Sequence, residues 1–190
     1  MSPIHPPWIY QSQSTIIAYA QMTTADKSLQ SSAVRELLHL VLSRLGKQSV
    51  LSDDNFPYRL MVGSLAQEFV SFSHSADCVA LIISPYPCGV DVEKRAITQA
   101  VAKRFFSHHE NLYLQNYPAD TQAIYRQILW QLKESWIKLN GGTLTQGMGV
   151  DFGQYLAHIH PQNDSIIPLH DGYMTYINPS LHLSAIFQMD

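Results

Sequence analysis

Two short segments carry carboxylates at spacings that could bind a metal ion. The first is Gly89-Val90-Asp91-Val92-Glu93-Lys94. Successive side chains on a β-strand point to opposite faces, so Val90 and Val92 would face a core while Asp91 and Glu93 share the other face. Their backbones would be about 6.6 Å apart, and both side chains could reach one hard cation such as Mg²⁺. Without a cation the two negative charges would repel each other. The alternative is a solvated strand face, which is what an isolated D-x-E pattern most often marks.

The second segment is residues 130–138, W-Q-L-K-E-S-W-I-K, and its periodicity predicts a helix. The apolar stripe comprises Tyr125, Ile128, Leu129, Leu132, Trp136 and Leu139. Glu134 and Lys138 lie on the other side as an i,i+4 pair, and Gly141-Gly142 would end the helix. Such a pair can be surface decoration that contributes only about 0.2–0.5 kcal/mol. The flanking tryptophans and the sparse use of charge, 12 Lys+Arg and 15 Asp+Glu in 190 residues, favour a functional role.

Composition predicts a compact soluble protein and excludes several classes. A hydrophobic content of 46% in 190 residues is enough for one substantial core or two small domains. The longest strongly apolar run, residues 79–83, is far shorter than the roughly 20 residues of a membrane-spanning helix. Residues 1–7 show no secretory signal, so we expect a cytoplasmic location. Cys78 and Cys88 form no C-x-x-C pair, and a net charge of −3 argues against nucleic-acid binding.

The order of predicted elements suggests two halves, each with a helix on a small sheet. An extended arm covers the first ten residues, and a helix is expected from the caps at Ser31-Ser32 to Gly46. Pro85 to Pro87 interrupts the chain, and we place a domain boundary there, giving residues 1–87 and 88–190. The expected strands are 14–20, 69–72, 79–84 and the D-x-E segment; further helices are expected at 98–106 and 109–116, and closing strands after Gly147.

Taken together, the motifs resemble the 4′-phosphopantetheinyl transferases of the surfactin-synthetase-activating type. The G-x-D-x-E-K and W-x-x-K-E-S-x-x-K segments form a specific combination. Similarity continues through Phe72-Ser73-His74-Ser75, residues 101–107 and Gly141-Gly142-Thr143-Leu144, and covers roughly residues 55–152. The resemblance implies an α+β fold built as a pseudo-dimer of two similar subdomains, with the active site between them. Residues 1–87 would bind the nucleotide side of coenzyme A, and residues 88–190 would carry the metal and catalytic motifs.

The implied reaction is the Mg²⁺-dependent transfer of 4′-phosphopantetheine from coenzyme A to a serine of an apo acyl or peptidyl carrier protein, with release of adenosine 3′,5′-bisphosphate. The enzyme would act as a monomer, without nucleic-acid or membrane partners. Carrier proteins are typically acidic around the serine, so the basic residues Lys94, Arg95, Lys103 and Arg104 are the expected contact surface, although half of them could be solvated surface. Carriers of fatty acid, polyketide and peptide synthesis all remain open.

The resemblance also implies roles for residues of the two acidic segments. Asp91, Glu93 and Glu134 would be the Mg²⁺ ligands. Glu134 is also the expected general base, although a metal-bound water could relay the proton instead. Lys138 would place a positive charge on the phosphates, and Lys133 could assist.

Other expected coenzyme A contacts come from the first half of the chain. His74 matches the family position that contacts the 3′-phosphate, next to Ser73. Arg59 stands where the family usually carries a lysine in G-K-P, but here the triplet is Tyr58-Arg59-Leu60. Arg35 could reach the 3′-phosphate or remain a solvated helix residue, and Lys27 is the nearest match to further basic residues. The full expected coenzyme A set is Arg35, Arg59, Ser73, His74, Asp91, Lys133 and Lys138.

Two other functions compete with this reading. A metal-dependent nuclease or phosphodiesterase also uses clustered acids with a nearby lysine, but it would require a basic groove that a net charge of −3 does not supply. A non-catalytic coenzyme A binding module would tolerate loss of the base, whereas all three acids are present here.

Overall fold

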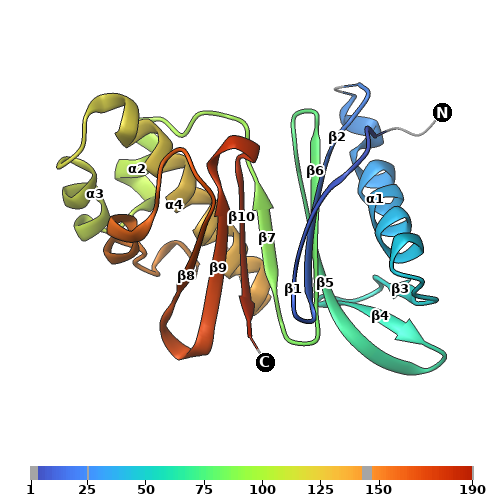
Figure 1. Ribbon diagram of the computed structural model, residues 1–190. Coiled ribbons are helices and arrows are strands. Elements are labelled where there is room, and N and C mark those ends of the chain that lie inside the picture. Colours follow the sequence, from blue (N-terminus) through green and yellow to red (C-terminus); the bar gives the residue numbers. More distant parts are fainter. Residues whose placement is uncertain (1–3, 25, 143–146, 190) are drawn as a thin grey trace.

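The computed structural model describes residues 4–24, 26–142 and 147–189, and its strands form two antiparallel sheets. The six-stranded sheet has the order β1 (Trp8–Ser12), β2 (Thr15–Gln21), β6 (Cys78–Ser84), β5 (Leu65–Ser75), β4 (Tyr58–Val62) and β3 (Val50–Ser52). The four-stranded sheet has the order β7 (Gly89–Val92), β10 (Leu183–Gln188), β9 (Tyr173–Asn178) and β8 (Ser165–Pro168). Figure 1 shows the sheets side by side at the centre, with helices on both outer sides. The expected α+β class is therefore confirmed.

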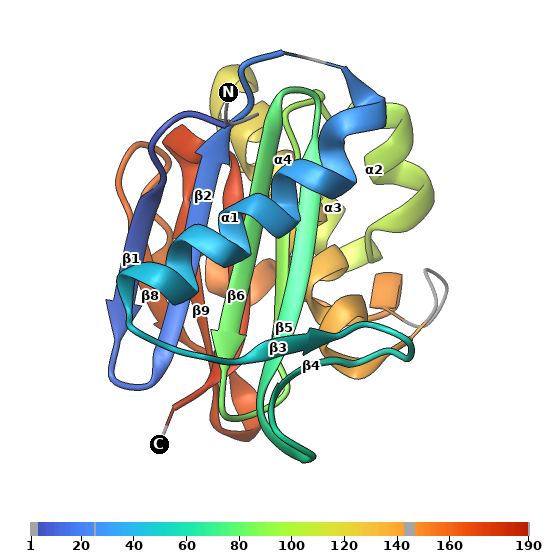
Figure 2. The ribbon, with the colours of Figure 1, turned by 90° about the vertical axis from the view of Figure 1, so that its right-hand side faces the viewer.

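Helix α1 (Gln30–Arg44) lies across the outer face of the six-stranded sheet, as Figure 2 shows. Val34, Leu37 and Val41 on its inner side are buried against the sheet. The helix ends as predicted before Gly46, whose φ of +64° suits a residue without a side chain. The predicted cap at Ser31-Ser32 is wrong, because a short 3₁₀ turn over Lys27–Leu29, capped by the Asp26 side chain, precedes the helix.

Three helices cover the outer side of the four-stranded sheet. They are α2 (Gln99–Phe105), α3 (His108–Leu114) and α4 (Ala119–Asn140), close to the predicted ranges. Side chains of Thr98 and Ser107 cap α2 and α3, and Gly141 ends α4 with a φ of +62°. Thr143 and Leu144, part of the family resemblance, lie outside the described residues. A short 3₁₀ segment at Gly153–His158 precedes the closing strands, and two others, at His170–Gly172 and Pro179–Leu181, connect them.

An apolar cluster between the two sheets joins them. Val90 and Val92 are 0% and 1% exposed and belong to one cluster with Ile17 and Ile82, so the predicted inward face of β7 is confirmed. Cys78 and Cys88 are buried free thiols. The predicted extended arm is only partly right, because its end forms edge strand β1, paired with β2 from Trp8 onward.

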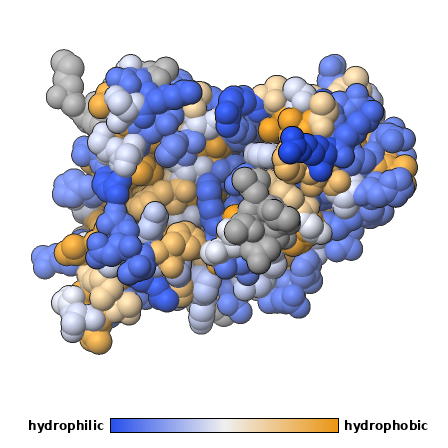
Figure 3. Space-filling model, turned by 180° about the vertical axis from the view of Figure 1, so that it is seen from behind, coloured by the Kyte–Doolittle hydropathy of each residue, from blue (hydrophilic) through white to orange (hydrophobic). Residues whose placement is uncertain are grey.

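The surface carries hydrophobic residues in several separate places. In the rear view of Figure 3 they are interspersed among hydrophilic residues. Val62 and Leu65, at the turn between β4 and β5, are 50% and 66% exposed. In the part of the chain that the structure describes, no helix is long and apolar enough to cross a membrane.

Candidate active site

A cavity of about 480 Å³ collects most of the predicted site residues. Asp91 and Glu93 reach it from β7 and its end, Glu134 and Lys138 from α4, and His74 from β5. The other lining residues are Ser31, Val34, Arg35, Tyr58, Phe72, Ser73, Val92, Arg95 and Trp130. Strand β4 pairs with β5 only as far as the register Tyr58–Val70. The C-terminal part of β5 therefore continues past β4, and this is where the cavity opens beside α1.

Gly89 explains how β7 and α4 come so close. A Cβ atom at this position would lie 1.9 Å from the backbone oxygen of Ser135 and 2.9 Å from the backbone nitrogen of Leu139. Only glycine permits this approach without a shift of the helix. The close packing brings Glu134 and Lys138, on the same side of α4, to the carboxylates of β7. The glycine of the G-x-D-x-E motif thus has a role in building the site.

Asp91 is held from two directions. The residue is buried, with 7% of its surface exposed. Its Oδ1 accepts hydrogen bonds from Ser73 Oγ at 2.9 Å and from Lys138 Nζ at 2.8 Å. Lys138 Nζ also donates to the backbone oxygen of Val90 at 2.9 Å. Lys138 is therefore at the site, as predicted, and its charge is placed next to the Asp91 carboxylate.

Glu93 is similarly buried but faces a different partner. Its Oε1 accepts from Ser75 Oγ at 2.6 Å, and Arg95 Nη2 donates to its Oε2 at 2.8 Å. Burial raises the pKa of Glu93, but hydrogen bonds from Arg95 and Ser75 outweigh it and leave the pKa below the usual range. Glu93 is therefore ionised and neutralised by Arg95.

Glu134 has the opposite electrostatic situation. Burial raises the pKa of this carboxyl, the negative charges of Asp91 and Glu93 raise it further, and Lys138 acts in the other direction. Within the described residues we find no hydrogen bond or ion pair to its oxygens. A half-buried carboxylate that feels two like charges and lacks a direct partner is a site where a cation or a proton is favoured.

The three acids do not form a ready-made metal site. In the described portions of the chain, no group of three or more His, Cys, Asp or Glu side chains is gathered closely enough to hold an ion. The two oxygens of Glu93, which lines the cavity, are bound by Ser75 and Arg95. Asp91 and Glu134 still fit Mg²⁺ by their chemistry, because this ion is usually bound by one or two carboxylates together with substrate phosphates and water. The role of all three acids as Mg²⁺ ligands therefore stays a prediction.

The expectation that Lys133 contacts phosphates is contradicted. Lys133 is 0% exposed and lies on the core side of α4, where its Nζ is 2.9 Å from Glu110 Oε2. It also donates to the backbone oxygens of Met148 and Val150. The physical reason is helical geometry, because the side chains of adjacent helix residues point about 100° apart. Glu134 faces the cavity, so its neighbour Lys133 points to the core.

Arg59 also lies away from the cavity. Alternation along β4 places Tyr58 in the cavity wall and Arg59 on the opposite face, where its guanidinium carbon is 3.3 Å from the centroid of the Phe69 ring. The predicted coenzyme A contact of Arg59 is therefore not supported by this arrangement.

Arg35, Ser73 and His74 do line the cavity, in different ways. His74 is exposed. Arg35 pairs with Asp53 and donates to Ser31 Oγ at 2.6 Å, so it lies at the rim with its charge already partnered. Ser73 is buried, and its hydroxyl is engaged with protein groups on β7.

Sequence reasoning missed several wall residues. Tyr58, Phe72 and Trp130 give the cavity an aromatic lining, and Arg95 reaches it although we had expected it on a carrier-binding surface. The alternation Y-R-L in β4 was the available signal for Tyr58. For Arg95, the available signal was its position two residues after Glu93, close enough for its side chain to pair with that carboxylate.

Comparison with known proteins places both acidic segments inside a family match. A family model described as the 4′-phosphopantetheinyl transferase superfamily matches residues 87–182, about half of the chain. The 4′-phosphopantetheinyl transferase psf-1 of Bacillus pumilus is 26% identical over 157 residues, 82% of this chain and 65% of the relative. The 4′-phosphopantetheinyl transferase Sfp of Bacillus subtilis (strain 168) is 31% identical over 113 residues, 59% of this chain and 49% of the relative.

A third relative is the 4′-phosphopantetheinyl transferase gsp of Aneurinibacillus migulanus, which is 30% identical over 141 residues, 69% of this chain and 60% of the relative. The chain spans about half to two thirds of the length of these relatives. The extent of the family match nevertheless identifies it: the chain belongs to the 4′-phosphopantetheinyl transferase superfamily.

Proposed function

We propose that the protein transfers 4′-phosphopantetheine from coenzyme A to a serine of an apo acyl or peptidyl carrier protein in a Mg²⁺-dependent reaction. The observation that carries this proposal is the convergence of Asp91, Glu93, Glu134 and Lys138 on one cavity, from two elements far apart in the sequence. The printed names of the relatives, all phosphopantetheinyl transferases, support the same reaction.

The reaction requires a base for the carrier serine. As the serine oxygen bonds to the β-phosphorus of coenzyme A, the bond from this phosphorus to the bridging oxygen breaks, and the electron pair leaves with adenosine 3′,5′-bisphosphate. The serine proton passes to Glu134, directly or through a water. Without a bound cation, burial and the neighbouring charges of Asp91 and Glu93 raise the pKa of Glu134.

Charge on the pyrophosphate also has to be balanced. Asp91 and Glu134 are the proposed Mg²⁺ ligands, with Glu93, which is paired with Arg95, as the third. The ion, when bound, would stabilise negative charge on the phosphate oxygens. Lys138 holds Asp91 Oδ1 at 2.8 Å and lies next to the position proposed for the phosphates, so it both fixes a ligand and adds positive charge.

Binding of the two substrates would involve different edges of the site. We assign the nucleotide end of coenzyme A to the edge formed by His74 and Arg35. The carrier contact is best supported for Lys103 and Arg104, which are exposed on α2. Lys94 and Arg95 are already paired with Asp77 and Glu93. The division at residue 87 into two subdomains, the pseudo-dimer, and action as a cytoplasmic monomer remain part of this proposal.

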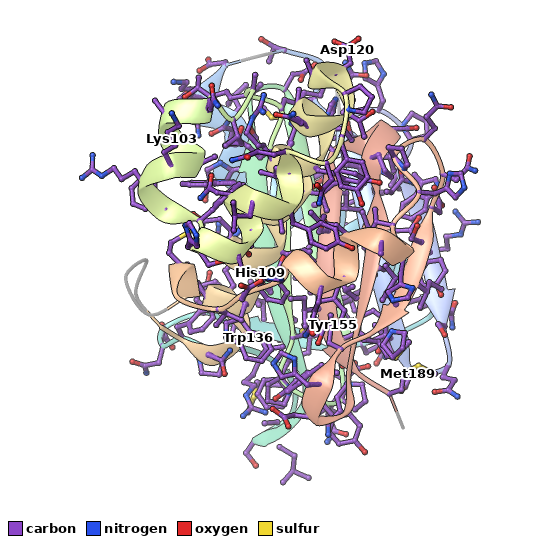
Figure 4. All side chains as sticks on the ribbon, turned by 90° about the vertical axis from the view of Figure 1, so that its left-hand side faces the viewer. Lys103, His109, Asp120, Trp136, Tyr155 and Met189 are labelled. Atoms are coloured by element: carbon purple, nitrogen blue, oxygen red, sulfur yellow. The ribbon has the colours of Figure 1, made fainter. Side chains whose placement is uncertain are left out.

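The test is an intact-mass measurement of several apo carrier proteins after incubation with the protein, coenzyme A and Mg²⁺. We expect a gain of one phosphopantetheine on at least one carrier, lost with a chelator and with Glu134→Gln. A matched control is Asp120→Asn, an exposed acid at the opposite end of α4, near the top of Figure 4. Unmodified carriers despite measurable coenzyme A binding would support a binding module instead, and release of nucleotides from DNA would support a nuclease.

A further inference from the structure

Three serines on one face of β5 bind the backbone of β7. Ser71, Ser73 and Ser75 are spaced by two, and each hydroxyl oxygen accepts a hydrogen bond from a β7-side amide. The donors are the amides of Val90 at 3.3 Å, Val92 at 3.1 Å and Lys94 at 3.2 Å. Both segments advance by two residues in the same direction from one contact to the next. The serine hydroxyls therefore accept from the β7 amides as the carbonyl oxygens of a parallel strand would.

The position of β7 explains why these contacts are needed. It is an edge strand of its sheet and pairs with β10 on one side only. The amide of Glu93 donates to His182 on the β10 side, so the alternate amides of Val90, Val92 and Lys94 point the other way. Amides in a buried interface require partners. The three serines, which are 1%, 5% and 6% exposed, supply them.

Two of the three hydroxyls have a second task. A serine hydroxyl that accepts from an amide still has its own proton to donate. Ser73 donates to Asp91 Oδ1 at 2.9 Å, and Ser75 donates to Glu93 Oε1 at 2.6 Å. Ser71 makes the same amide contact, but within the described residues it donates to no carboxylate. One side chain thus fixes both the strand and the acid that projects from it.

We propose that Ser73 and Ser75 are positioning residues: each holds one carboxylate oxygen, Asp91 Oδ1 and Glu93 Oε1, and so fixes the acid at the cavity where the metal ion would bind. This inference rests on the proposed function, because it concerns the same carboxylates. It gives Ser73 a different task from the predicted coenzyme A contact. Groups that hydrogen-bond metal-binding carboxylates set their orientation and basicity, and their loss typically weakens metal affinity about 10- to 100-fold.

The test compares Ser73→Ala and Ser75→Ala with the matched control Ser71→Ala. Mn²⁺ is the probe, and free Mn²⁺ is measured by electron paramagnetic resonance during titration of each folded protein, with thermal unfolding recorded in parallel. All three variants lose an amide contact and should unfold at lower temperature than wild type. We expect Mn²⁺ affinity to fall at least about tenfold for Ser73→Ala and Ser75→Ala, but less than about twofold for Ser71→Ala.

Equal losses of affinity in all three variants, or none in Ser73→Ala and Ser75→Ala, would overturn the inference, as would a wild-type protein that does not bind Mn²⁺. If an alanine variant fails to fold, Thr and Val at the same position provide a pair of similar shape that differs in the hydroxyl. Thr should retain affinity that Val loses. Carrier modification is measured separately: the expected affinity pattern without transfer would reject the proposed function alone, and transfer without the pattern would reject this inference alone.

Discussion

Replacement of Lys133 by methionine provides a sharp test of how α4 is divided between core and site. The Lys133 ammonium and the Glu110 carboxylate are both 0% exposed, with Nζ and Oε2 2.9 Å apart. Lys133→Met keeps the apolar stem but removes the charge and the hydrogen bonds to the Met148 and Val150 oxygens. Among the described residues, Glu110 would keep only its hydrogen bonds from the amides of Ser107 and Phe152, at 2.8 and 2.9 Å.

The expected cost is large because one buried charge loses its partner. Breaking such a pair typically costs about 3–5 kcal/mol. For a domain of this size each kcal/mol lowers Tm by about 2–4 °C, so Tm should fall by about 6–20 °C. Lys133→Met combined with Glu110→Gln should recover part of the loss, since it leaves no unpaired charge. Lys103→Met, at an exposed lysine labelled on α2 in Figure 4, is the control and should leave Tm nearly unchanged.

Thermal unfolding followed by circular dichroism measures the effect, and steady-state kinetics of transfer are measured at a temperature where the variant is folded. Because Lys133 lies outside the cavity lining, the KM for coenzyme A should stay within about twofold of wild type. A nearly unchanged Tm together with a KM raised about tenfold would refute this reasoning and return Lys133 to the phosphates.

Other substitutions probe the site and its surroundings. Glu134→Gln should abolish transfer yet raise Tm at neutral pH in the presence of a chelator, because the raised pKa means that ionised Glu134 destabilises the metal-free fold. This penalty is absent below the unfolded pKa near 4.5 and complete above the folded pKa, so the gain in Tm over wild type should vanish in acid. Asp91→Ala should abolish transfer while the protein remains folded by circular dichroism. His74→Ala should raise the KM for coenzyme A more than it lowers kcat, and the reverse would place His74 in the chemical step. Hydrogen bonds from Lys94 and Gln21 lower the pKa of Asp77 from 3.8 to about 2. The ionised carboxylate therefore stabilises the fold fully above pH 3.8, and this stabilisation is lost as the pH falls through about 2. Asp77→Asn should lower Tm at neutral pH but not below about pH 2.

The parts of the site that could be predicted from sequence are those governed by local periodicity. The stripe of α4 and the alternation of β7 put Glu134, Lys138 and Asp91 on the correct faces. The same rules, applied residue by residue, would have placed Lys133 in the core and Arg59 opposite Tyr58. Both residues carry a positive charge suited to phosphate, but burial of Lys133 and the contact of Arg59 with Phe69 put their side chains away from the cavity.

Other features depend on partners that no local pattern reveals. The alternation of Ser71, Ser73 and Ser75 is visible in the sequence, but it does not show that β7 lies beside them. The Arg95 contact that occupies Glu93 likewise depends on the turn after β7. The pairing of Lys133 with Glu110 joins residues on two helices, and the need for it follows only from burial of both.

The most direct test of the central claim is a crystal structure of the protein with coenzyme A and Mn²⁺, in which anomalous scattering locates the metal. We predict a peak in the cavity between Asp91 and Glu134, bound by oxygens of both side chains and of the pyrophosphate. A metal and pyrophosphate located elsewhere, with these two carboxylates contacting neither, would contradict the account.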